Sequence, residues 1–253
     1  MAISAVLIVK NEAHHLRACL ETLTFVDDIA VLDAGSQDET LAIAREFTDN
    51  VSVEADWQGF GVQRQRAEAL ARGDWILMID ADERVTDELR ESILKAVENG
   101  PAVYSLPRLS WCFGRFIRHS GWYPDRVLRL YPKGEASYNA ALVHEKLVVP
   151  DSLKILPLGG DLLHYTYRDV RHYLEKSAHY ADAWAEQRAA RGKSASLGQG
   201  VMHGLGCFLK MYLLKAGFRD GAQGLLLAIL SAHSTFNKYA ALWVRSKQGV
   251  EKR

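Results

Sequence analysis

Two aspartates, Asp80 and Asp82, follow directly after an apolar run at residues 75–79. Such a run is typical of a buried strand, so both carboxylates come at the end of that strand. Carboxylate oxygens suit Mg²⁺ or Mn²⁺, which bind one or two carboxylates together with the oxygens of a phosphate. The alternative is a solvated turn whose carboxylates cap the helix that starts near Thr86. The aspartate pair alone does not decide between a metal site and such a turn.

Two further polar clusters follow apolar runs earlier in the chain. Residues 10–12 come directly after the run at 3–9, and residues 33–38 come after the run at 29–32. Parallel sheets place their ligands at the carboxyl ends of the strands, which meet at one edge. If these runs are strands of one parallel sheet, the three polar clusters form a single site.

Strand-like and helical patterns alternate strictly up to about residue 110. Short β-branched apolar runs indicate buried strands, and apolar residues at every third or fourth position indicate helices. Strict alternation predicts crossover units, a mainly parallel sheet and an α/β fold. The strands are predicted at residues 3–9, 29–32, 51–53 and 75–79, and the helices at 13–22, 39–47, 60–71 and 87–97.

A second zone follows with a different pattern. Residues 103–108, 143–149 and 162–166 are predicted as further strands or as an excursion from the sheet, and an aromatic and basic stretch at 111–131 lies among them. From Arg168 onward the pattern is helical. Three helices are predicted there, at residues 168–191, 201–216 and 222–243.

The composition is that of a globular protein with a full-sized core. The chain has 253 residues, 48% of them hydrophobic and 25% charged, which argues against disorder. Basic and acidic residues number 31 each, so the net charge is zero and a function in coating nucleic acid is excluded. The charge is uneven, because residues 203–253 carry eight basic residues against two acidic ones.

The cysteines and the N-terminus indicate a cytoplasmic protein. Cys19, Cys112 and Cys207 are far apart and match neither a disulfide framework nor a metal motif. The first residues lack the pattern of an export signal. The longest apolar run, residues 225–230, is far shorter than the roughly 18–20 residues of a membrane span. We therefore expect a reducing compartment and no transmembrane segment.

Three motifs together resemble the successive signatures of family 2 glycosyltransferases, which have the GT-A fold. They are Ile8-Val9-Lys10-Asn11-Glu12, then Leu32-Asp33-Ala34-Gly35-Ser36-Gln37-Asp38, then Gly73-Asp74 leading to Asp80-Ala81-Asp82-Glu83. The resemblance implies that Asp33 contacts the uridine of a UDP-sugar donor. It also implies that Asp80 and Asp82 bind a divalent cation, Mg²⁺ or Mn²⁺, with Asp82 as the direct ligand. The implied donor-binding residues are Val9, Asn11, Glu12, Asp33, Gly35, Ser36, Gln63, Arg66, Asp80 and Ala81.

Further segments resemble the subgroup that contains the lipopolysaccharide core β-1,4-glucosyltransferases. These segments are residues 57–67, residues 121–125 with 129–131, and Val143-His144-Glu145. The resemblance covers essentially the whole chain. It implies an inverting enzyme that transfers a hexose, glucose from UDP-glucose, to a heptose of the lipopolysaccharide inner core in a β-1,4 linkage.

We divide the chain on these grounds into two domains. Residues 1–166 are the expected GT-A catalytic domain, with a nucleotide-sugar-binding half at 1–110 and an acceptor-side half at 111–166. Residues 167–253 are a basic, helical C-terminal extension.

Gln63, Arg64 and Arg66 open the helix predicted after residue 60. Polar donors at a helix N-terminus, together with the positive end of the helix dipole, can face an anionic donor. The alternative is that these side chains form the solvated face of an amphipathic helix.

Sugar transfer also requires a base that takes the proton of the acceptor hydroxyl. The candidates are Glu145 and Asp125, of which we prefer Glu145, since many family 2 enzymes have an acidic residue at that place. His144 and Glu145 can instead form a structural pair, and Asp125 after Pro124 can be a turn residue.

The acceptor side combines aromatic and basic residues. Aromatic faces suit sugars and arginine suits phosphate, so this zone can bind a phosphorylated sugar, although core packing explains each aromatic residue equally well. The acceptor-binding residues we expect are Trp122, Tyr123, Arg126, Arg129 and His144.

The C-terminal helices alternate apolar and basic residues and carry aromatic ones. Such helices can lie on an anionic membrane surface, or they can pack on the catalytic domain or on a second subunit. Because the family's acceptor is a lipid-anchored glycan, we expect peripheral contact at the cytoplasmic face of the inner membrane.

Rival functions make different demands on the sequence. A glycosyltransferase for another surface polysaccharide or lipid-linked glycan fits the same motifs. A nucleotidyltransferase needs a glycine-rich phosphate loop after the first strand, and residues 10–13 contain no glycine. A non-catalytic sugar-binding or membrane-assembly protein is expected to have lost the carboxylates, which this chain retains.

Overall fold

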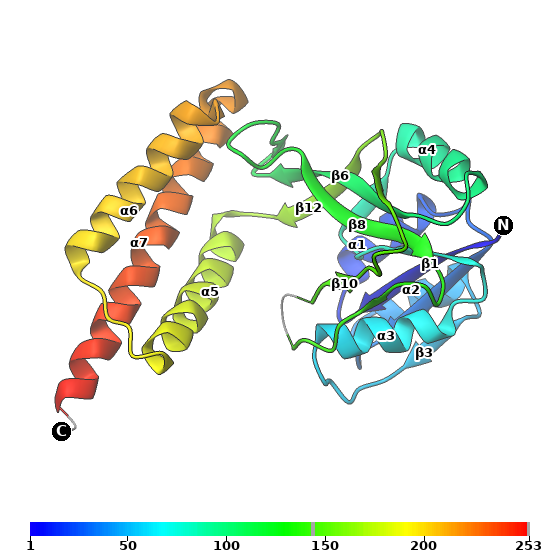
Figure 1. The fold of residues 1–253 in the computed structure, drawn as a ribbon, viewed down its shortest axis with the longest axis horizontal. Helices are drawn as coiled ribbons and strands as arrows, with labels where there is room; N and C mark the ends of the chain where they lie inside the picture. The colour runs from blue at the N-terminus through cyan, green and yellow to red at the C-terminus, as the bar shows by residue number, and fades with distance from the viewer. Residues whose placement is uncertain (143–144, 252–253) are drawn as a thin grey trace. The chain divides into compact units, whose positions relative to one another are not determined.

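The computed structural model describes residues 1–142 and 145–251 (Figure 1). The chain divides into two compact units. The first unit contains Met1–Arg108 and Asp125–His164, and the second contains Leu109–Pro124 and Tyr165–Arg253. The segment Leu109–Pro124 falls mainly within the expected acceptor-side half, yet it clusters with the C-terminal helices.

A mixed sheet runs through the first unit. Its strands follow the order β3-β2-β1-β4-β8-β6-β12-β5, and β1 is parallel to both of its neighbours, as predicted. Strand β8 is antiparallel to β4 and β6, so the sheet is mixed beyond its parallel N-terminal half. The strands are β1 (Ile3–Val9), β2 (Asp28–Asp33), β3 (Val51–Val53), β4 (Trp75–Met78), β5 (Glu83–Val85), β6 (Val103–Cys112), β8 (Asp125–Pro132) and β12 (Leu162–Tyr167).

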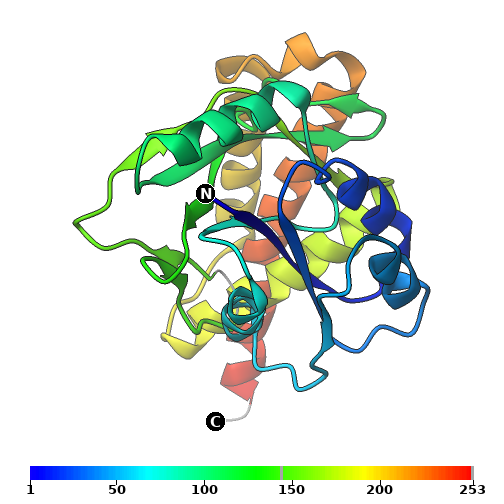
Figure 2. The same ribbon diagram turned by 90° about the vertical axis from the view of Figure 1, so that its right-hand side faces the viewer.

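Side chains that alternate along β1 and β4 belong to two separate cores. Leu7 and Leu77 lie in one core, and their neighbours Val6 and Ile76 lie in the other. The first core includes residues of α1, α2 and α4, and the second includes Ala67 of α3, so helices cover both faces of the sheet (Figure 2). Burial on both faces explains why these strands are continuous apolar runs. The helices are α1 (Ala13–Glu21), α2 (Thr40–Phe47), α3 (Phe60–Leu70) and α4 (Asp87–Glu98).

Helix α4 has its own N-terminal cap. The hydroxyl of Thr86 accepts a hydrogen bond from Leu89 N at 3.3 Å. A threonine at this position satisfies one of the free N–H groups of the first turn. The alternative interpretation of Asp80 and Asp82 as capping residues of this helix is therefore wrong.

Short strands complete the second half of the chain. The strand predicted at residues 143–149 is reduced to β10 (Leu147–Val148), which pairs with β9 (Ser137–Tyr138). Val143 and His144 lie outside the described residues. The remaining short strands, β7 (Arg115–Phe116) and β11 (Ile155–Pro157), both pair with β6.

The second unit is mainly helical, as predicted. Helix α6 packs along α7 (Figure 1), and Gly204 brings the two close, because a Cβ there would lie 3.1 Å from Ala232 O. Cys112, Ile117 and Leu227 are fully buried in the core of this unit. The helices are α5 (Val170–Ala190), α6 (Leu197–Leu209), the π-helical turn η1 (Lys210–Leu214), the 3₁₀ turn η2 (Gly217–Asp220) and α7 (Gly221–Glu251). None of the described helices combines the length and apolar character that crossing a bilayer requires.

Candidate active site

The first two polar clusters lie together at the carboxyl ends of β1 and β2. Val9 pairs with Asp33 in the register of these strands. The hydroxyl of Ser36 accepts a hydrogen bond from Asn11 N at 2.8 Å, and Oδ1 of Asn11 accepts one from Gln37 N at 2.8 Å. Asn11 has a φ of 55°, a left-handed conformation that asparagine tolerates better than most residues. The two loops therefore form one continuous surface, as the sequence predicts.

Asp33 is a buried carboxylate with one satisfied oxygen. Its Oδ1 accepts hydrogen bonds from Gly35 N and Ser36 N, both at 2.8 Å. Its Oδ2 is buried and has no hydrogen-bond partner in the part of the chain that the structure describes. A buried polar atom without a partner is costly, and native proteins rarely keep one without a reason. Oδ2 is thus an acceptor suited to a bound ligand.

Asp80 lies between two buried arginines. Its Oδ1 accepts from Arg64 Nη2 at 2.9 Å, and its Oδ2 accepts from Arg129 Nη2. The same Arg129 nitrogen lies 3.1 Å from Glu83 Oε1, and Oε2 of Glu83 accepts from Asp80 N at 2.9 Å. Glu145 joins this cluster through Arg64, whose Nε donates to Glu145 Oε1 at 2.9 Å. Three carboxylates and two guanidinium groups therefore form one network.

Burial and charge act in opposite directions in this network. Burial alone would raise the pKa of Asp80, but Arg129 and Arg64 hold that pKa well below its usual range. Burial raises the pKa of Glu83, although Arg129 opposes this shift. Asp80 is therefore ionised at neutral pH, with both oxygens occupied by arginines. The metal-side role predicted for Asp80 gains no support from these contacts.

Asp82 differs from Asp80 in its surroundings. Its side chain is 27% exposed, and its Oδ2 lies 3.3 Å from Nε2 of His164. His164 comes from β12 and pairs with Glu83 in the strand register. No group of three or more His, Cys, Asp or Glu side chains that could hold a metal ion is found among residues 1–142 and 145–251. Asp82 and His164 together offer an oxygen and a nitrogen ligand.

The two candidate bases have different partners. Glu145 is 14% exposed and is linked to Asp80 through Arg64. Asp125 is 44% exposed, and its Oδ2 accepts from Arg108 at 2.5 and 3.0 Å. Glu145 is thus linked to the Asp80 network through Arg64, and Asp125 is linked to it through Arg108, which lies 3.6 Å from Glu83.

The first backbone N–H groups of α3 are bonded to a loop of the chain. Phe60 N donates to Leu142 O at 3.1 Å, and Gly61 N donates to Ala141 O at 3.0 Å. The backbone of Asn139 also packs against this turn, since a Cβ on Gly61 would lie 1.9 Å from Asn139 O. The first two N–H groups of α3 are therefore satisfied within the chain, and the prediction that concerns Gln63, Arg64 and Arg66 depends on their side chains.

Gln63 and Arg66 hold a neighbouring loop. Nε2 of Gln63 donates to Glu54 O at 3.1 Å, and Arg66 Nη1 donates to Gln63 Oε1 at 2.8 Å and to Asp56 O at 2.6 Å. Gln63 is only 1% exposed, so it is not on a solvated face either. Arg64 is the member of this group that reaches the Asp80 network.

Three other residues expected at the donor site form hydrogen bonds through their backbone atoms. The side chains of Val9 and Ala81 are buried in the core. Their carbonyl oxygens accept from Ala34 N at 2.8 Å and from Arg84 at 2.9 Å, respectively. Glu12 N donates to Thr40 Oγ1 at 2.8 Å, which fixes the turn at the end of β1.

The expected acceptor residues are divided between the two units. Arg129 is buried and bound to Asp80 and Glu83, so in this structure its guanidinium group serves the network. Arg126 donates to Ser105 O at 3.2 Å. Trp122 and Tyr123 belong to the second unit, and His144 lies outside the described residues.

Sequence reasoning did not identify Glu83 and His164 as site residues. Glu83 directly follows Asp82, so its position in the motif was the available signal. His164 is a single histidine within a strand pattern, and only the pairing of β12 with β5 brings it to the cluster.

Comparison with known proteins agrees with this geometry. Residues 4–146 match the model of the family described as glycosyl transferase family 2. The chain is similar to an uncharacterized glycosyltransferase of Rickettsia felis, with 29% identity over 95% of this chain and 89% of the relative. It is also similar to the lipopolysaccharide core biosynthesis glycosyltransferase LpsC of Rhizobium meliloti, with 26% identity over 97% of this chain and 93% of LpsC.

Among solved structures, TarS of S. aureus is similar over 72% of this chain and 39% of that chain, with 16% identity and a TM-score of 0.47. The family match covers more than half of the chain, including every strand end described above. The α/β architecture, with a mainly parallel N-terminal half and C-terminal helices, is the fold expected from the sequence. The chain belongs to glycosyl transferase family 2, and it is a glycosyltransferase of the GT-A fold.

Proposed function

We propose that the protein is an inverting transferase that moves a hexose, glucose from UDP-glucose, to a heptose of the lipopolysaccharide inner core in a β-1,4 linkage. One observation carries the proposal. Asp33, with its unpaired buried oxygen, and the Asp80 network stand at the ends of β2 and β4, the two strands that flank β1. A site for a nucleotide diphosphate needs a hydrogen-bond acceptor for the nucleoside and charged groups for the diphosphate at one edge of the sheet.

Asp33 is the residue we assign to the nucleoside. Its Oδ2 can accept a hydrogen bond from a base N–H or a ribose hydroxyl, which would satisfy the unpaired atom. The loop that carries Asn11 and the turn at Gly35 and Ser36 adjoin it and line the same surface. Because Oδ1 is already held by two backbone N–H groups, the carboxylate is fixed before the donor arrives.

Arg64 is the residue we assign to the leaving diphosphate. Its guanidinium group binds Asp80 and Glu145, yet Nη1 is buried and has no partner among the described residues. The pKa of Arg64 is raised: burial opposes the charge, but Asp80 outweighs that effect. A permanently charged donor with a free N–H suits an oxygen that gains negative charge as the glycosidic bond to the donor breaks.

A divalent cation, Mg²⁺ or Mn²⁺, fits the residues at this edge. Asp82 supplies carboxylate oxygens, His164 supplies an imidazole nitrogen close by, and a bound diphosphate supplies further oxygens. When bound, such a cation neutralises charge on the leaving diphosphate. We assign Asp82 as its principal protein ligand and His164 as the second.

Glu145 is the residue we assign as the base. An inverting transfer is a single displacement, so it needs one group that accepts the proton of the acceptor hydroxyl. Asp80 is a poor base because its pKa lies far below neutrality. Glu83 is completely buried, so it cannot reach an acceptor. Glu145 is partly exposed and belongs to the same network, and Asp125 is the alternative.

The choice of acceptor is supported by LpsC, whose name assigns it to lipopolysaccharide core biosynthesis and which is similar over nearly its whole length. We propose the same class of acceptor for this chain. Such a glycan is anchored in lipid, so we place the reaction at the cytoplasmic face of the inner membrane, with peripheral contact through the basic C-terminal helices.

Calorimetric titration of UDP in the presence of Mn²⁺ tests the donor site. The variant Asp33→Asn keeps one side-chain oxygen for the turn but replaces the other oxygen, Oδ2, with an amide donor. We therefore expect the affinity for UDP to fall about tenfold or more. Asp49→Asn is the matched control, because the Asp49 side chain is 85% exposed. Equal UDP binding by both variants, or no UDP binding by the wild type, would overturn the assignment of Asp33.

A further inference from the structure

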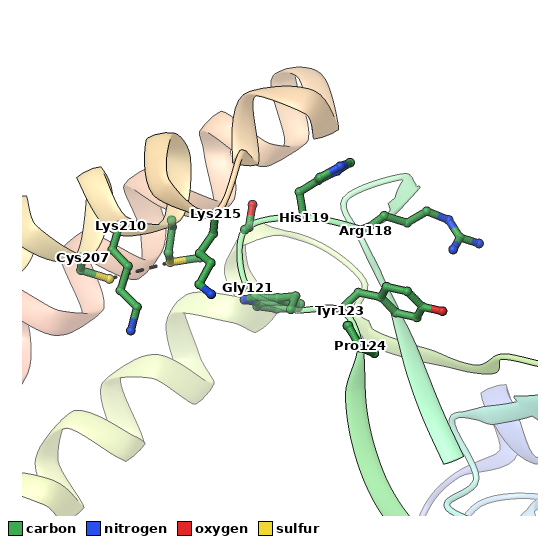
Figure 3. Close-up of a pocket in the computed structure, with 11 residues that line it drawn as sticks. Arg118, His119, Gly121, Tyr123, Pro124, Cys207, Lys210 and Lys215 are labelled. Carbon is green, nitrogen blue, oxygen red and sulfur yellow. Dashed lines mark hydrogen bonds between the residues drawn. The ribbon is translucent and has the colours of Figure 1, made fainter. Parts of the chain in front are cut away.

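A pocket of about 660 Å³ lies within the second unit (Figure 3). The loop at residues 118–124 forms one wall, and four residues of the segment 207–215 form the other. Its volume is in the usual range for small-ligand sites. All of these residues belong to the second unit, so the pocket is separate from the Asp80 network of the first.

The pocket lining is basic. Lys210, Lys215 and Arg118 contribute three positive charges, and none of the eleven described residues that line it is acidic. Figure 3 shows Lys210 and Lys215 extending from the helical segment in the same direction. Arg118 lies over the ring of Tyr123, 5.3 Å from its centroid. The two lysines are therefore the cations that face a common ligand.

The π-helical turn η1 explains why the two lysines lie on one side. Lys215 N donates to Lys210 O at 2.8 Å, so one wide turn separates them. In an α-helix, residues five apart differ by about 140° around the axis, and the lysines would diverge. π-helical turns are rare and occur frequently at functional sites.

The opposite wall of the pocket is held in place by Asp220, which is 1% exposed. Its carboxylate accepts from Arg118 N at 3.2 Å, from His119 N at 2.8 Å and lies 3.0 Å from Nδ1 of His119. Ser120 N donates to Lys215 O at 2.9 Å, which ties the loop to η1. Asp220 is therefore buried against the loop and does not line the pocket.

An exposed aliphatic stripe runs along α6 and η1, the elements that carry the lysines. Its members recur at every fourth residue, so each lies beside the next and the stripe winds slowly around the helix. Between residues 196 and 219 every charged residue is basic. Exposed apolar residues beside basic ones are typical of helices that lie in the interface of an anionic bilayer. The stripe consists of Leu197, Val201, Leu205, Leu209 and Leu213, which are 41 to 55% exposed.

We propose that this surface docks on an anionic phospholipid bilayer, with a lipid phosphate in the pocket between Lys210 and Lys215. Charge complementarity selects this occupant, because a basic surface without acidic residues matches phosphate headgroups. The aliphatic stripe then enters the hydrocarbon boundary of the bilayer. The proposal deepens the membrane contact of the proposed function and rests on it in that respect.

Flotation with vesicles tests the proposal on the full chain. The wild type is expected to float with vesicles of equal parts phosphatidylcholine and phosphatidylglycerol and not with phosphatidylcholine alone. Lys210→Gln with Lys215→Gln should weaken this binding roughly ten- to thirtyfold. The control, Lys95→Gln with Lys193→Gln, removes the same charge from exposed positions elsewhere and should bind like the wild type. Leu205→Ser with Leu213→Ser should also weaken binding to the anionic vesicles, because the double variant lacks two apolar side chains of the stripe.

Several results would overturn the proposal. These are no binding to the anionic vesicles, equal weakening in the lysine control, or equal binding to neutral vesicles. Binding of soluble glycerol 3-phosphate that needs both lysines, without vesicle binding, would leave a phosphate site but overturn the bilayer as its occupant. UDP binding, measured on the same preparations, separates this result from a failure of the donor site, because the lysine variants should bind UDP as the wild type does.

Discussion

Removal of the Arg129 side chain is expected to destabilise the first unit strongly. Arg129 is 5% exposed and binds two carboxylates, the fully buried one of Glu83 and the 30% exposed one of Asp80. In Arg129→Met, Asp80 keeps its ion pair with Arg64, whereas among the described residues the remaining arginine in an ion pair with Glu83 is Arg108, at 3.6 Å. Breaking a buried ion pair from one side costs about 3–5 kcal/mol, because the partner charge stays buried. We expect a loss of that size in the free energy of unfolding near neutral pH.

The loss should depend on pH in a defined direction. The pKa of Glu83 is raised in the folded protein, so its carboxyl contributes most to stability below the ordinary glutamate pKa and loses that contribution as pH rises through the folded pKa. Without Arg129 the pKa of Glu83 rises further. The pKa of Asp80 is depressed, so its contribution is present above the ordinary aspartate pKa and is lost on acidification. The change at Glu83 makes the deficit of the variant shrink as the pH falls toward about 5. The change at Asp80 adds to this only below about pH 4, the ordinary aspartate pKa.

Urea unfolding followed by circular dichroism measures this deficit at several pH values. Adding Glu83→Gln to Arg129→Met removes the buried charge and should restore about 1–3 kcal/mol. Arg72→Met is the control, because Arg72 is 59% exposed in its pair with Asp49 and should cost at most about 1 kcal/mol. A deficit below about 1 kcal/mol for Arg129→Met, or one that grows on acidification, would refute the reasoning.

Three other variants test separate parts of the account. In calorimetric titrations, Asp82→Ala should abolish the enhancement of UDP binding by Mn²⁺. His164→Ala should reduce this enhancement about tenfold or more, because the variant lacks the second metal ligand. Unchanged enhancement in both variants would contradict the assigned metal ligands. In turnover assays, Glu145→Gln should lower kcat by a factor of about 10² to 10⁴ without changing UDP-glucose binding. Asp125→Asn should lower kcat much less. The reverse pattern would make Asp125 the base. In thermal unfolding, Gly61→Ala should cost about 1–3 kcal/mol, since its Cβ would lie 1.9 Å from Asn139 O, and Gly198→Ala, whose nearest such contact is 3.8 Å, should be nearly neutral.

The strand ends could be predicted because their signals are local. The apolar run before Asp80 and the alternation of strands and helices determine that a parallel sheet forms and that its polar ends meet. The place of Asp33 after a strand was predicted in the same way, whereas its role came from the family resemblance. The structure adds that Asp33 Oδ2 has no hydrogen-bond partner among the described residues.

The partners of these residues could not be predicted because they are distant in sequence. Arg64 and Arg129 are 16 and 49 residues from Asp80, and neither spacing follows a helix or strand period. The loop that covers the start of α3 is likewise more than 75 residues away, and only packing brings Ala141 and Leu142 to that turn. The helices of the second unit were predicted from their periodicity, but the clustering of residues 109–124 with them depends on tertiary contacts.

Direct observation of sugar transfer tests the central claim most directly. The full chain is incubated with UDP-glucose, Mn²⁺ and lipopolysaccharide whose inner-core heptose lacks its hexose, and the product is identified by mass spectrometry and NMR. The account predicts one added glucose in a β-1,4 linkage on the heptose, which Glu145→Gln fails to form. Absence of transfer from UDP-glucose despite tight UDP binding, or a product with an α-linked sugar, would contradict it.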